Sequence, residues 1–284
     1  MVKYFYKVLN RLKISKYFNF IIHKKINGDN LKIPIIYNIG MEHFQISEIW
    51  MIPILKSILK IKDGVFFDIG VNTGQTLLKL RSVSKEIPYY GFEPNPKCVF
   101  YAEELIRVNS FKNCVIIPVG IMTNNELLRL NFFSESETDS SASLVSDFRP
   151  NEKTYNSKLV PVFNYNSINL PSVEIAVLKI DVEGAELFVI EALIEKIKVD
   201  QPLILMEILP TYHSENKERI NKQKTLETLL KNCGYIFYRI MKETNPISLN
   251  CITEIEIHSD MELVEYLILP NSFHDQIVKE FSIY

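Results

Sequence analysis

A glycine-bearing turn holds the residues with the clearest chemical meaning in this chain. It lies between an apolar run at 65–69 and an apolar helical pattern that begins near residue 73. Gly70 and Gly74 have the spacing G-x-x-x-G, and the missing Cβ atoms let the backbone approach a ligand closely. The free N–H groups at the start of the helix would face that ligand. The two glycines alone also suit a plain connection between a strand and a helix.

An acidic residue after the next strand favours a cofactor that carries a ribose. Residues 88–92 read as a strand, and Glu93 follows it directly. A carboxylate roughly 20 residues past such a turn can accept hydrogen bonds from both ribose hydroxyls. NAD and S-adenosylmethionine both satisfy this geometry. The alternative for Glu93, a solvated acid in a loop, is weaker once the preceding turn is counted.

The elements that must position these residues alternate between strands and helices. Apolar runs predict buried strands at 65–69, 88–92, 114–119, 175–180 and 202–206, and helices are expected at 97–108, 186–197 and 218–232. This alternation predicts a Rossmann-like, doubly wound α/β fold whose mostly parallel sheet binds ligands at the carboxyl ends of its strands. Two late strands, at 235–240 and 263–269, lack a crossover helix and predict an antiparallel final hairpin. Strands at 126–133 and 159–164 are expected to pair with each other around a polar, mobile loop at 134–146.

Composition narrows the function classes. The 284 residues are 47% hydrophobic with a net charge of −2, which is ordinary for a globular protein and does not suggest nucleic-acid binding. The four cysteines show no metal-type spacing, so we expect a reducing, cytoplasmic environment. No apolar run is long enough to span a bilayer, and the N-terminus lacks the features of a signal peptide.

The first 62 residues are expected to form a helical and strand-containing extension to a domain at 63–284. Residues 1–25 interleave lysines and arginines with aromatic residues and contain no acid. That pattern suits an amphipathic helix on the inner face of an anionic membrane. The alternative is a helical arm that packs on the catalytic domain or on a second subunit of a homodimer. A strand at 31–37 and a helix at 46–61 should follow.

Together, these motifs resemble the FkbM-type family of S-adenosylmethionine-dependent methyltransferases. The resemblance lies in F-D-I-G-V-N-T-G-Q at 67–75, G-F-E-P-N-P at 91–96, S-S-A-S-L at 140–144, L-K-I-D-V-E-G-A-E at 178–186 and L-M-E-I at 205–208. It implies a class I methyltransferase fold. It also implies an O-methyltransferase, usually acting on a hydroxyl of a sugar in a surface glycan or of a secondary metabolite. Residues 1–45 carry no family motif.

The resemblance also implies which residues contact the cofactor. The set is Asp68, Gly70, Asn72, Thr73, Gly74, Glu93, Pro94, Asn95, Gly120, Ile121, Ser141 and Asp181. The residues of the turn would cradle the methionine part, Glu93 would hold the ribose, and Gly120 and Ile121 would flank the adenine. Many methyltransferases have an acid at that last position, which this chain lacks. Ser141 would lie in a loop that closes over the cofactor.

Four candidate catalytic residues fall at the carboxyl ends of the fourth and fifth buried strands: Asp181, Glu183, Glu207 and His213. Methyl transfer mainly needs alignment of the acceptor oxygen, and a base helps because a sugar hydroxyl is a poor nucleophile. His213 is the base best matched to neutral pH, although it also suits a surface loop. Asp181 and Glu207 can hold Mg²⁺, but direct hydrogen bonds to cofactor and acceptor are the simpler interpretation.

Three alternatives stay open. Glu183 and Glu186 also suit favourable charges at a helix N-terminus, which is the preferred interpretation for Glu186. An NAD-dependent oxidoreductase or epimerase would share the ribose acid, but the G-x-x-x-G turn departs from its usual motif. A non-catalytic, membrane-associated module that binds the cofactor would explain the basic aromatic N-terminus.

Overall fold

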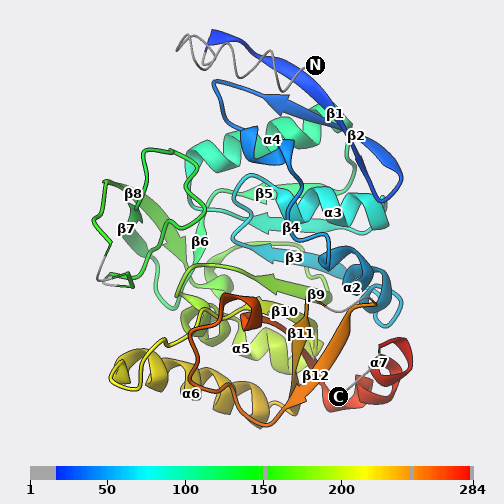
Figure 1. Ribbon diagram of the computed structural model, residues 1–284, viewed down its shortest axis with the longest axis vertical. Coiled ribbons are helices and arrows are strands. Elements are labelled where there is room, and N and C mark those ends of the chain that lie inside the picture. The colour runs from blue at the N-terminus through cyan, green and yellow to red at the C-terminus, as the bar shows by residue number, and fades with distance from the viewer. Residues whose placement is uncertain (1–16, 147, 150–151, 244–245, 282–284) are drawn as a thin grey trace.

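A twisted sheet of eight strands forms the centre of the computed structural model, which describes residues 17–146, 148–149, 152–243 and 246–281 (Figure 1). Its strand order is β12-β11-β13-β10-β9-β3-β4-β5. The strands are β3 (Val65–Ile69), β4 (Tyr89–Phe92), β5 (Cys114–Ile117), β9 (Ile175–Ile180), β10 (Leu203–Glu207), β11 (Tyr235–Met241), β12 (Ser248–Ile252) and β13 (Glu265–Pro270). Strands β5, β4, β3, β9 and β10 are parallel, whereas β13 is antiparallel to both β10 and β11. The predicted Rossmann-like, mostly parallel sheet with an antiparallel end is confirmed.

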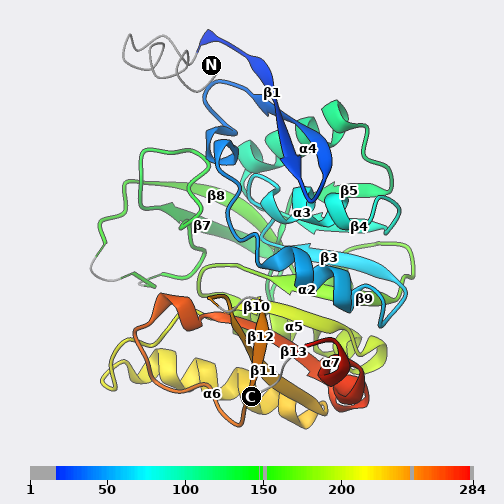
Figure 2. The same cartoon turned by 45° about the vertical axis from the view of Figure 1, so that its right-hand side comes forward.

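Helices cover both faces of this sheet (Figure 2). They are α2 (Met51–Ile58), α3 (Gln75–Val83), α4 (Pro96–Asn109), α5 (Glu186–Asp200), α6 (Lys217–Asn232) and α7 (His274–Glu280). Phe67 and Leu178 pack toward α5 and α6, while their neighbours Phe66 and Val177 pack toward α2, α3 and α7. Because both faces are buried, the central strands have the continuous apolar sequences from which they were predicted.

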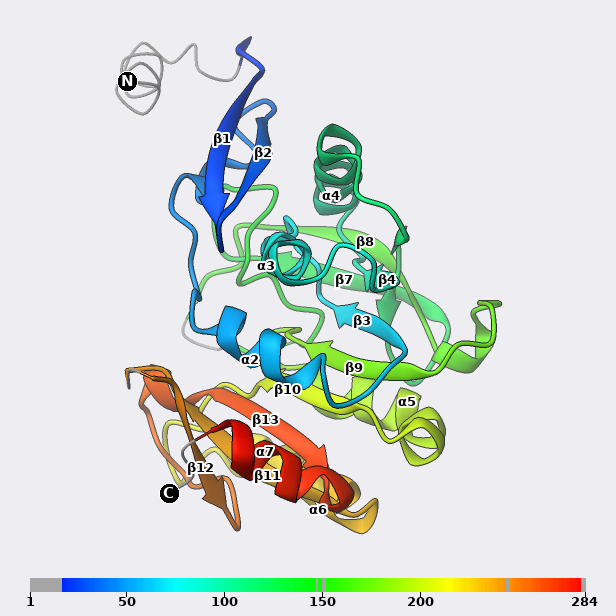
Figure 3. The same ribbon diagram turned by 90° about the vertical axis from the view of Figure 1, so that its right-hand side faces the viewer.

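The N-terminal part of the described chain is a β-hairpin. Strands β1 (Phe20–Ile26) and β2 (Asp29–Ile35) pair antiparallel, and Ile22 and Ile33 pack against Leu78 of α3 and Leu105 of α4 (Figure 3). The helical expectation for 1–25 is therefore wrong from Phe20 onward, where alternate side chains are buried as in a strand. Residues 1–16 lie outside the described residues, so the proposed membrane helix stays a prediction there.

Two other sequence expectations need correction. The helix expected at 46–61 is limited to α2, preceded by a 3-10 turn at Met41–Phe44. Its buried side chains belong to the same core as the central sheet, although the sequence places it in an extension. The strand expected to be buried at 114–119 is the edge strand β5, in which Val115 is 45% exposed. Strand β12, at the opposite edge, was not predicted.

A smaller sheet lies beside the central one. It contains β6 (Gly120–Ile121), β8 (Asn156–Phe163) and β7 (Glu126–Phe132), in that order. The antiparallel pairing of β7 with β8 confirms the predicted pair. Short 3-10 turns at Tyr165–Ser167, Met261–Leu263 and Asn271–Phe273 complete the elements. None of the helices in the described part of the chain has the length and apolar content needed to cross a membrane.

Candidate active site

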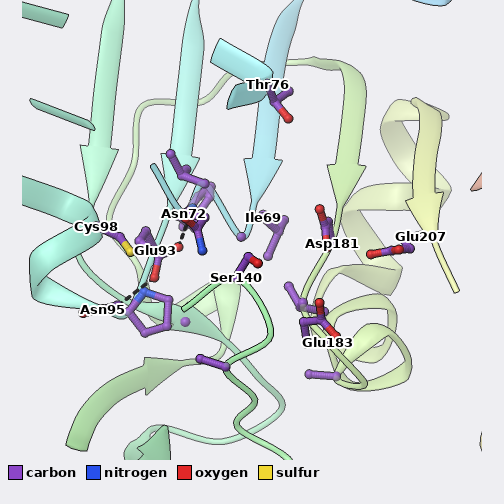
Figure 4. A pocket seen from close by; sticks show the side chains of 18 of the residues that line it. Ile69, Asn72, Thr76, Glu93, Asn95, Cys98, Ser140, Asp181, Glu183 and Glu207 are labelled. Atoms are coloured by element: carbon purple, nitrogen blue, oxygen red, sulfur yellow. Dashed lines mark hydrogen bonds between the residues drawn. The ribbon is translucent and has the colours of Figure 1, made fainter. Parts of the chain in front are cut away.

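A cavity of about 350 Å³ opens at the carboxyl ends of β3, β4, β9 and β10 (Figure 4). Its lining includes the turn after β3, Glu93 after β4, and the acids after β9 and β10. Figure 4 shows Asn72, Glu93 and Asn95 on one side of the cavity and Asp181, Glu183 and Glu207 on the other. The carboxyl edge of a parallel sheet is where such folds bind their ligands.

Glu93 is held rigidly at one side of this cavity. The backbone N–H of Asn72 donates to its Oε2 at 2.7 Å, and the N–H of Asn95 donates to its Oε1 at 2.8 Å. Burial raises the pKa of Glu93 to about 7, although these two hydrogen bonds act in the opposite direction. The carboxyl group is therefore preorganised to accept hydrogen bonds from a ligand, as expected for a residue that holds a ribose.

The turn after β3 requires glycine at its first position. Gly70 has φ of 89°, and a Cβ built there would lie 1.9 Å from the carbonyl oxygen of Asp181. Neighbouring Asn72 also lines the cavity, with φ of 47°. Thr73 and Gly74 do not line it: Thr73 is buried and Gly74 is the N-cap of α3. The turn thus places only part of the predicted set against a ligand.

An apolar slot lies beside Glu93. Pro94, Ile121, Leu130, Ala142 and Leu144 line it, together with Gly120. A Cβ on Gly120 would lie 3.2 Å from Leu144 and 3.6 Å from Pro94, so a side chain there would narrow the slot. Apolar walls suit an aromatic ring, so the adenine contact of Gly120 and Ile121 stays a prediction that these walls permit.

The polar loop at 134–146 is folded against the cavity by specific hydrogen bonds. Asp139 accepts from the N–H groups of Phe133 and Ser134 and from both the N–H and the Oγ of Ser141. Ser143 is fully buried and donates to the carbonyl of Glu183 at 2.7 Å. Ser141 therefore serves the loop and does not line the cavity, whereas Ser140 does. The prediction for Ser141 as a contact is corrected in this respect.

Three carboxylates face the cavity from the ends of β9 and β10. Oxygen atoms of Asp181, Glu183 and Glu207 all lie within 4.8 Å of one another. Burial and the charge of Asp181 raise the pKa of Glu207 to about 10. Burial acts upward on the pKa of Asp181 as well, but Lys179 and a hydrogen bond with Glu207 bring it below its usual value. Asp181 is thus ionised and Glu207 protonated at neutral pH.

Lys179 is the counter-ion of this group. Its Nζ lies 3.0 Å from Asp181 Oδ2 and 3.6 Å from Asp68 Oδ1. Asp68 itself is fully buried, accepts a hydrogen bond from Tyr89 Oη at 2.7 Å and does not line the cavity. The structure therefore places Asp68 in the core beside Lys179, and its predicted cofactor contact stays a prediction.

Glu183 occupies an unusual backbone position. Its φ of 51° is uncommon for a residue other than glycine, and such strain is often found at functional sites. Arg149 donates to its Oε2 at 2.9 Å. Burial and the charge of Asp181 nevertheless raise the pKa of Glu183 to about 7. The neighbouring Glu186 accepts a hydrogen bond from the N–H of Gly184, which agrees with its predicted place at a helix N-terminus.

His213 is the candidate that the structure removes from the site. It is exposed, lies between β10 and α6, and does not line the cavity that the other candidates line. Sequence position placed it near a strand end, but the chain turns away from the sheet after Thr211. The surface-loop alternative is the one observed.

Sequence reasoning missed Lys179, Cys98 and Thr76, which all line the cavity. Lys179 stands inside the motif L-K-I-D-V-E-G-A-E, and a lysine within an otherwise apolar strand was the available signal. Cys98 and Thr76 lie on helices whose sequence patterns indicate only ordinary buried positions. The three carboxylates are also a donor set that Mg²⁺ accepts, although Lys179 already balances the charge of Asp181.

The cavity residues fit S-adenosylmethionine in three respects. Glu93 matches a ribose, the apolar slot matches an adenine, and the glycine turn leaves backbone space for the methionine part. The three carboxylates lie on the other side, where an acceptor would meet the methyl group. These residues would therefore hold the cofactor along the carboxyl edge of the sheet.

A family comparison agrees with this fit. The family model described as a methyltransferase FkbM domain matches residues 68–237. Among solved structures, the FkbM methyltransferase of Methylobacillus flagellatus is 14% identical with a TM-score of 0.43; the match covers 73% of this chain but only 43% of that one. M. jannaschii TYW2, solved with AdoMet, is 13% identical with a TM-score of 0.39, covering 88% of this chain and 83% of that one. A search of curated proteins found no match. The family model spans more than half of this chain's length. The chain therefore belongs to the FkbM family of S-adenosylmethionine-dependent methyltransferases.

Proposed function

We propose that this protein transfers a methyl group to a hydroxyl oxygen, most simply that of a sugar unit in a glycan or of a secondary metabolite. When bound, S-adenosylmethionine supplies a methyl group on a sulfonium, which is already activated for displacement. The chain's own residues must then align the acceptor oxygen, remove its proton and keep water away. The cluster of Asp181, Glu183 and Glu207 is the observation that carries this proposal.

Glu183 is the group best suited to remove the proton. A general base works best when its pKa lies near the operating pH, and the pKa of Glu183 is about 7. Glu207, with a pKa of about 10, is already protonated at neutral pH. Although burial acts upward, Asp181 has a pKa below its usual value because of Lys179 and a hydrogen bond with Glu207, which makes it a weaker base than Glu183. Glu183 takes the role that the sequence suggested for His213.

Asp181 and Glu207 are suited to hold the acceptor. An ionised carboxylate accepts hydrogen bonds, and a protonated one donates a hydrogen bond. Since the proton of Glu207 is shared with Asp181, the pair can accept hydrogen bonds from two neighbouring hydroxyls of one sugar ring through its remaining lone pairs. Loop residues Ala142 and Leu144 lie against the same cavity and would exclude water from it.

One alternative function from the sequence is set aside, and the other expectations stay open. Membership of the FkbM family favours S-adenosylmethionine over NAD, so an oxidoreductase or epimerase is not proposed. Cytoplasmic location, membrane contact through residues 1–25, a homodimer and a bound Mg²⁺ stay predictions from the sequence.

The test is a transfer assay with a panel of glycans and hydroxylated metabolites and with S-adenosylmethionine labelled with carbon-13 in its methyl group. We expect a labelled methyl ether, whose position NMR of the product would give. A product labelled on nitrogen or carbon would contradict O-methyl transfer while leaving the methyltransferase class intact.

A further inference from the structure

A second cavity of about 340 Å³ lies behind the first. The two share their walls, because consecutive residues of the chain line one or the other. Leu144 faces the first cavity and Val145 the second, and the same division holds for Ala185 and Glu186. Glu207 and Ile208 repeat it at the end of β10. Burial lowers the pKa of Arg219, a residue of the second cavity, whereas the charges of Glu186 and Glu183 act upward on it. Arg219 therefore lies within electrostatic range of an acid that lines the first cavity.

Arg219 is the distinctive residue of the second cavity. It lies in the first turn of α6, and its Cζ is 4.2 Å from the ring centre of Phe148 and 5.4 Å from that of Tyr212. Within the part of the chain that the structure describes, its guanidinium forms no ion pair and donates no hydrogen bond. When an arginine is stacked on an aromatic ring, its N–H groups point outward in the plane of the guanidinium. There they can bind a planar anion.

The surrounding charges favour an anion with a single charge. Lys222, the other cation of this cavity, is neutralised by Glu218 at 2.7 Å. Glu186 also lines the cavity and would repel a second negative charge. A carboxylate matches the fork of one guanidinium through two parallel hydrogen bonds. The remaining wall includes Leu187, Ile208 and Leu226, which can pack against the apolar edge of a sugar ring.

We propose that the second cavity is the recognition subsite for the acceptor, in which Arg219 binds a carboxylate such as that of a uronic acid unit. The proposal rests on the function proposed above, since it presumes a hydroxyl acceptor. It assigns the acceptor class: an acidic sugar whose carboxylate contacts Arg219 while its hydroxyls reach the acids of the first cavity.

Binding measurements test this without needing turnover. The purified protein, with and without S-adenosylhomocysteine, would be titrated with D-glucuronate, D-glucose and D-glucose 6-phosphate, with binding read by ligand-observed NMR. The variant is Arg219→Gln, and Arg107→Gln is the matched control, because Arg107 lies exposed on α4. Hydrogen bonds to charged groups typically change affinity by roughly 10-fold or more.

We expect glucuronate to bind at least about 10-fold more tightly than glucose to the wild type and to Arg107→Gln, and we expect Arg219→Gln to lose this preference. Equal binding of the two sugars by the wild type, an unchanged preference in Arg219→Gln, or a preference for glucose 6-phosphate would each overturn the proposal. Calorimetry with S-adenosylhomocysteine distinguishes failure of this subsite proposal from failure of the proposed function. Retained binding of S-adenosylhomocysteine by Arg219→Gln shows that the cofactor site is folded, so a lost preference for glucuronate is then due to Arg219. No binding of S-adenosylhomocysteine by the wild type would contradict the proposed function on which this subsite rests.

Discussion

Lys179 Nζ lies 3.6 Å from Asp68 Oδ1, in a pair that is almost entirely buried and of which only Lys179 lines the cavity. The lysine also contacts Asp181 at 3.0 Å, and Tyr89 donates a hydrogen bond to Asp68. A chain of interactions thus runs from the core to the carboxylates that face the acceptor. Asp68 is a buried counter-ion of Lys179, and Lys179 also contacts Asp181 in the site.

Replacing Lys179 with methionine should destabilise the protein. The change leaves the buried Asp68 without its cation, and removing one partner of a buried pair costs about 3–5 kcal/mol. The double variant Asp68→Asn with Lys179→Met should recover part of this loss, because the asparagine is neutral and keeps the hydrogen bond from Tyr89. Chemical denaturation measures both. Strictly additive losses would show that the two residues are not coupled.

Glu183→Gln should lower kcat by about 100-fold or more, since a general base contributes roughly 10²–10⁴ in rate. Wild-type activity should rise with pH through about 7, where Glu183 loses its proton, and the variant should lack this rise. Glu152→Gln is the control, because Glu152 also accepts a hydrogen bond from Arg149 but is exposed. A fully active Glu183→Gln would remove this residue from the mechanism.

Glu93→Gln should weaken the binding of S-adenosylhomocysteine by roughly 10-fold or more. The amide cannot accept from both backbone N–H groups that now fix the carboxylate, and it places a donor where a ribose hydroxyl would donate. Calorimetry measures the affinity, with the exposed Glu103→Gln on α4 as the control. An unchanged affinity would show that Glu93 does not contact the cofactor.

Stability should fall as the pH rises above neutrality in the absence of ligand. Burial raises the pKa of several glutamates from 4.5, to about 7 for Glu93 and Glu186, about 8 for Glu265 and about 10 for Glu207. The folded chain therefore binds more protons than the unfolded chain. The stabilisation is complete below pH 4.5 and is lost as the pH rises through these values.

Denaturation at about pH 6 and about pH 9 would measure this loss, which is about 1.4 kcal/mol per pH unit for each extra proton bound by the folded state. Glu207→Gln should make the dependence shallower, whereas the exposed Glu126→Gln should leave it unchanged. A free energy of unfolding that rises over this range would show that these groups are ionised in the folded protein.

The sequence was sufficient for the inner strands of the central sheet and for one edge of the site. Strands such as β3 and β9 are buried on both faces, so their composition alone identifies them, and the residues that follow them must lie at the same edge. Gly70, Glu93 and Asp181 were placed correctly against the cavity for this reason. Motif order then supplied the family.

The rest depended on tertiary packing that no local pattern encodes. Asp68 lies inside β3 and Glu93 follows β4, but only Glu93 lines the cavity, while Asp68 contacts Lys179. His213 lies beyond a loop whose direction the sequence does not determine. Strand β1 of the hairpin with β2 was not predicted, because the basic residues before it suggested a helix that extends through Lys25.

Titration calorimetry of the purified protein with S-adenosylmethionine, with NAD as the control, tests the central claim most directly. We expect S-adenosylmethionine to bind at one site with a dissociation constant on the order of micromolar, and we expect no detectable heat with NAD. Binding of NAD, or of neither compound, would contradict the assignment of this cavity to S-adenosylmethionine.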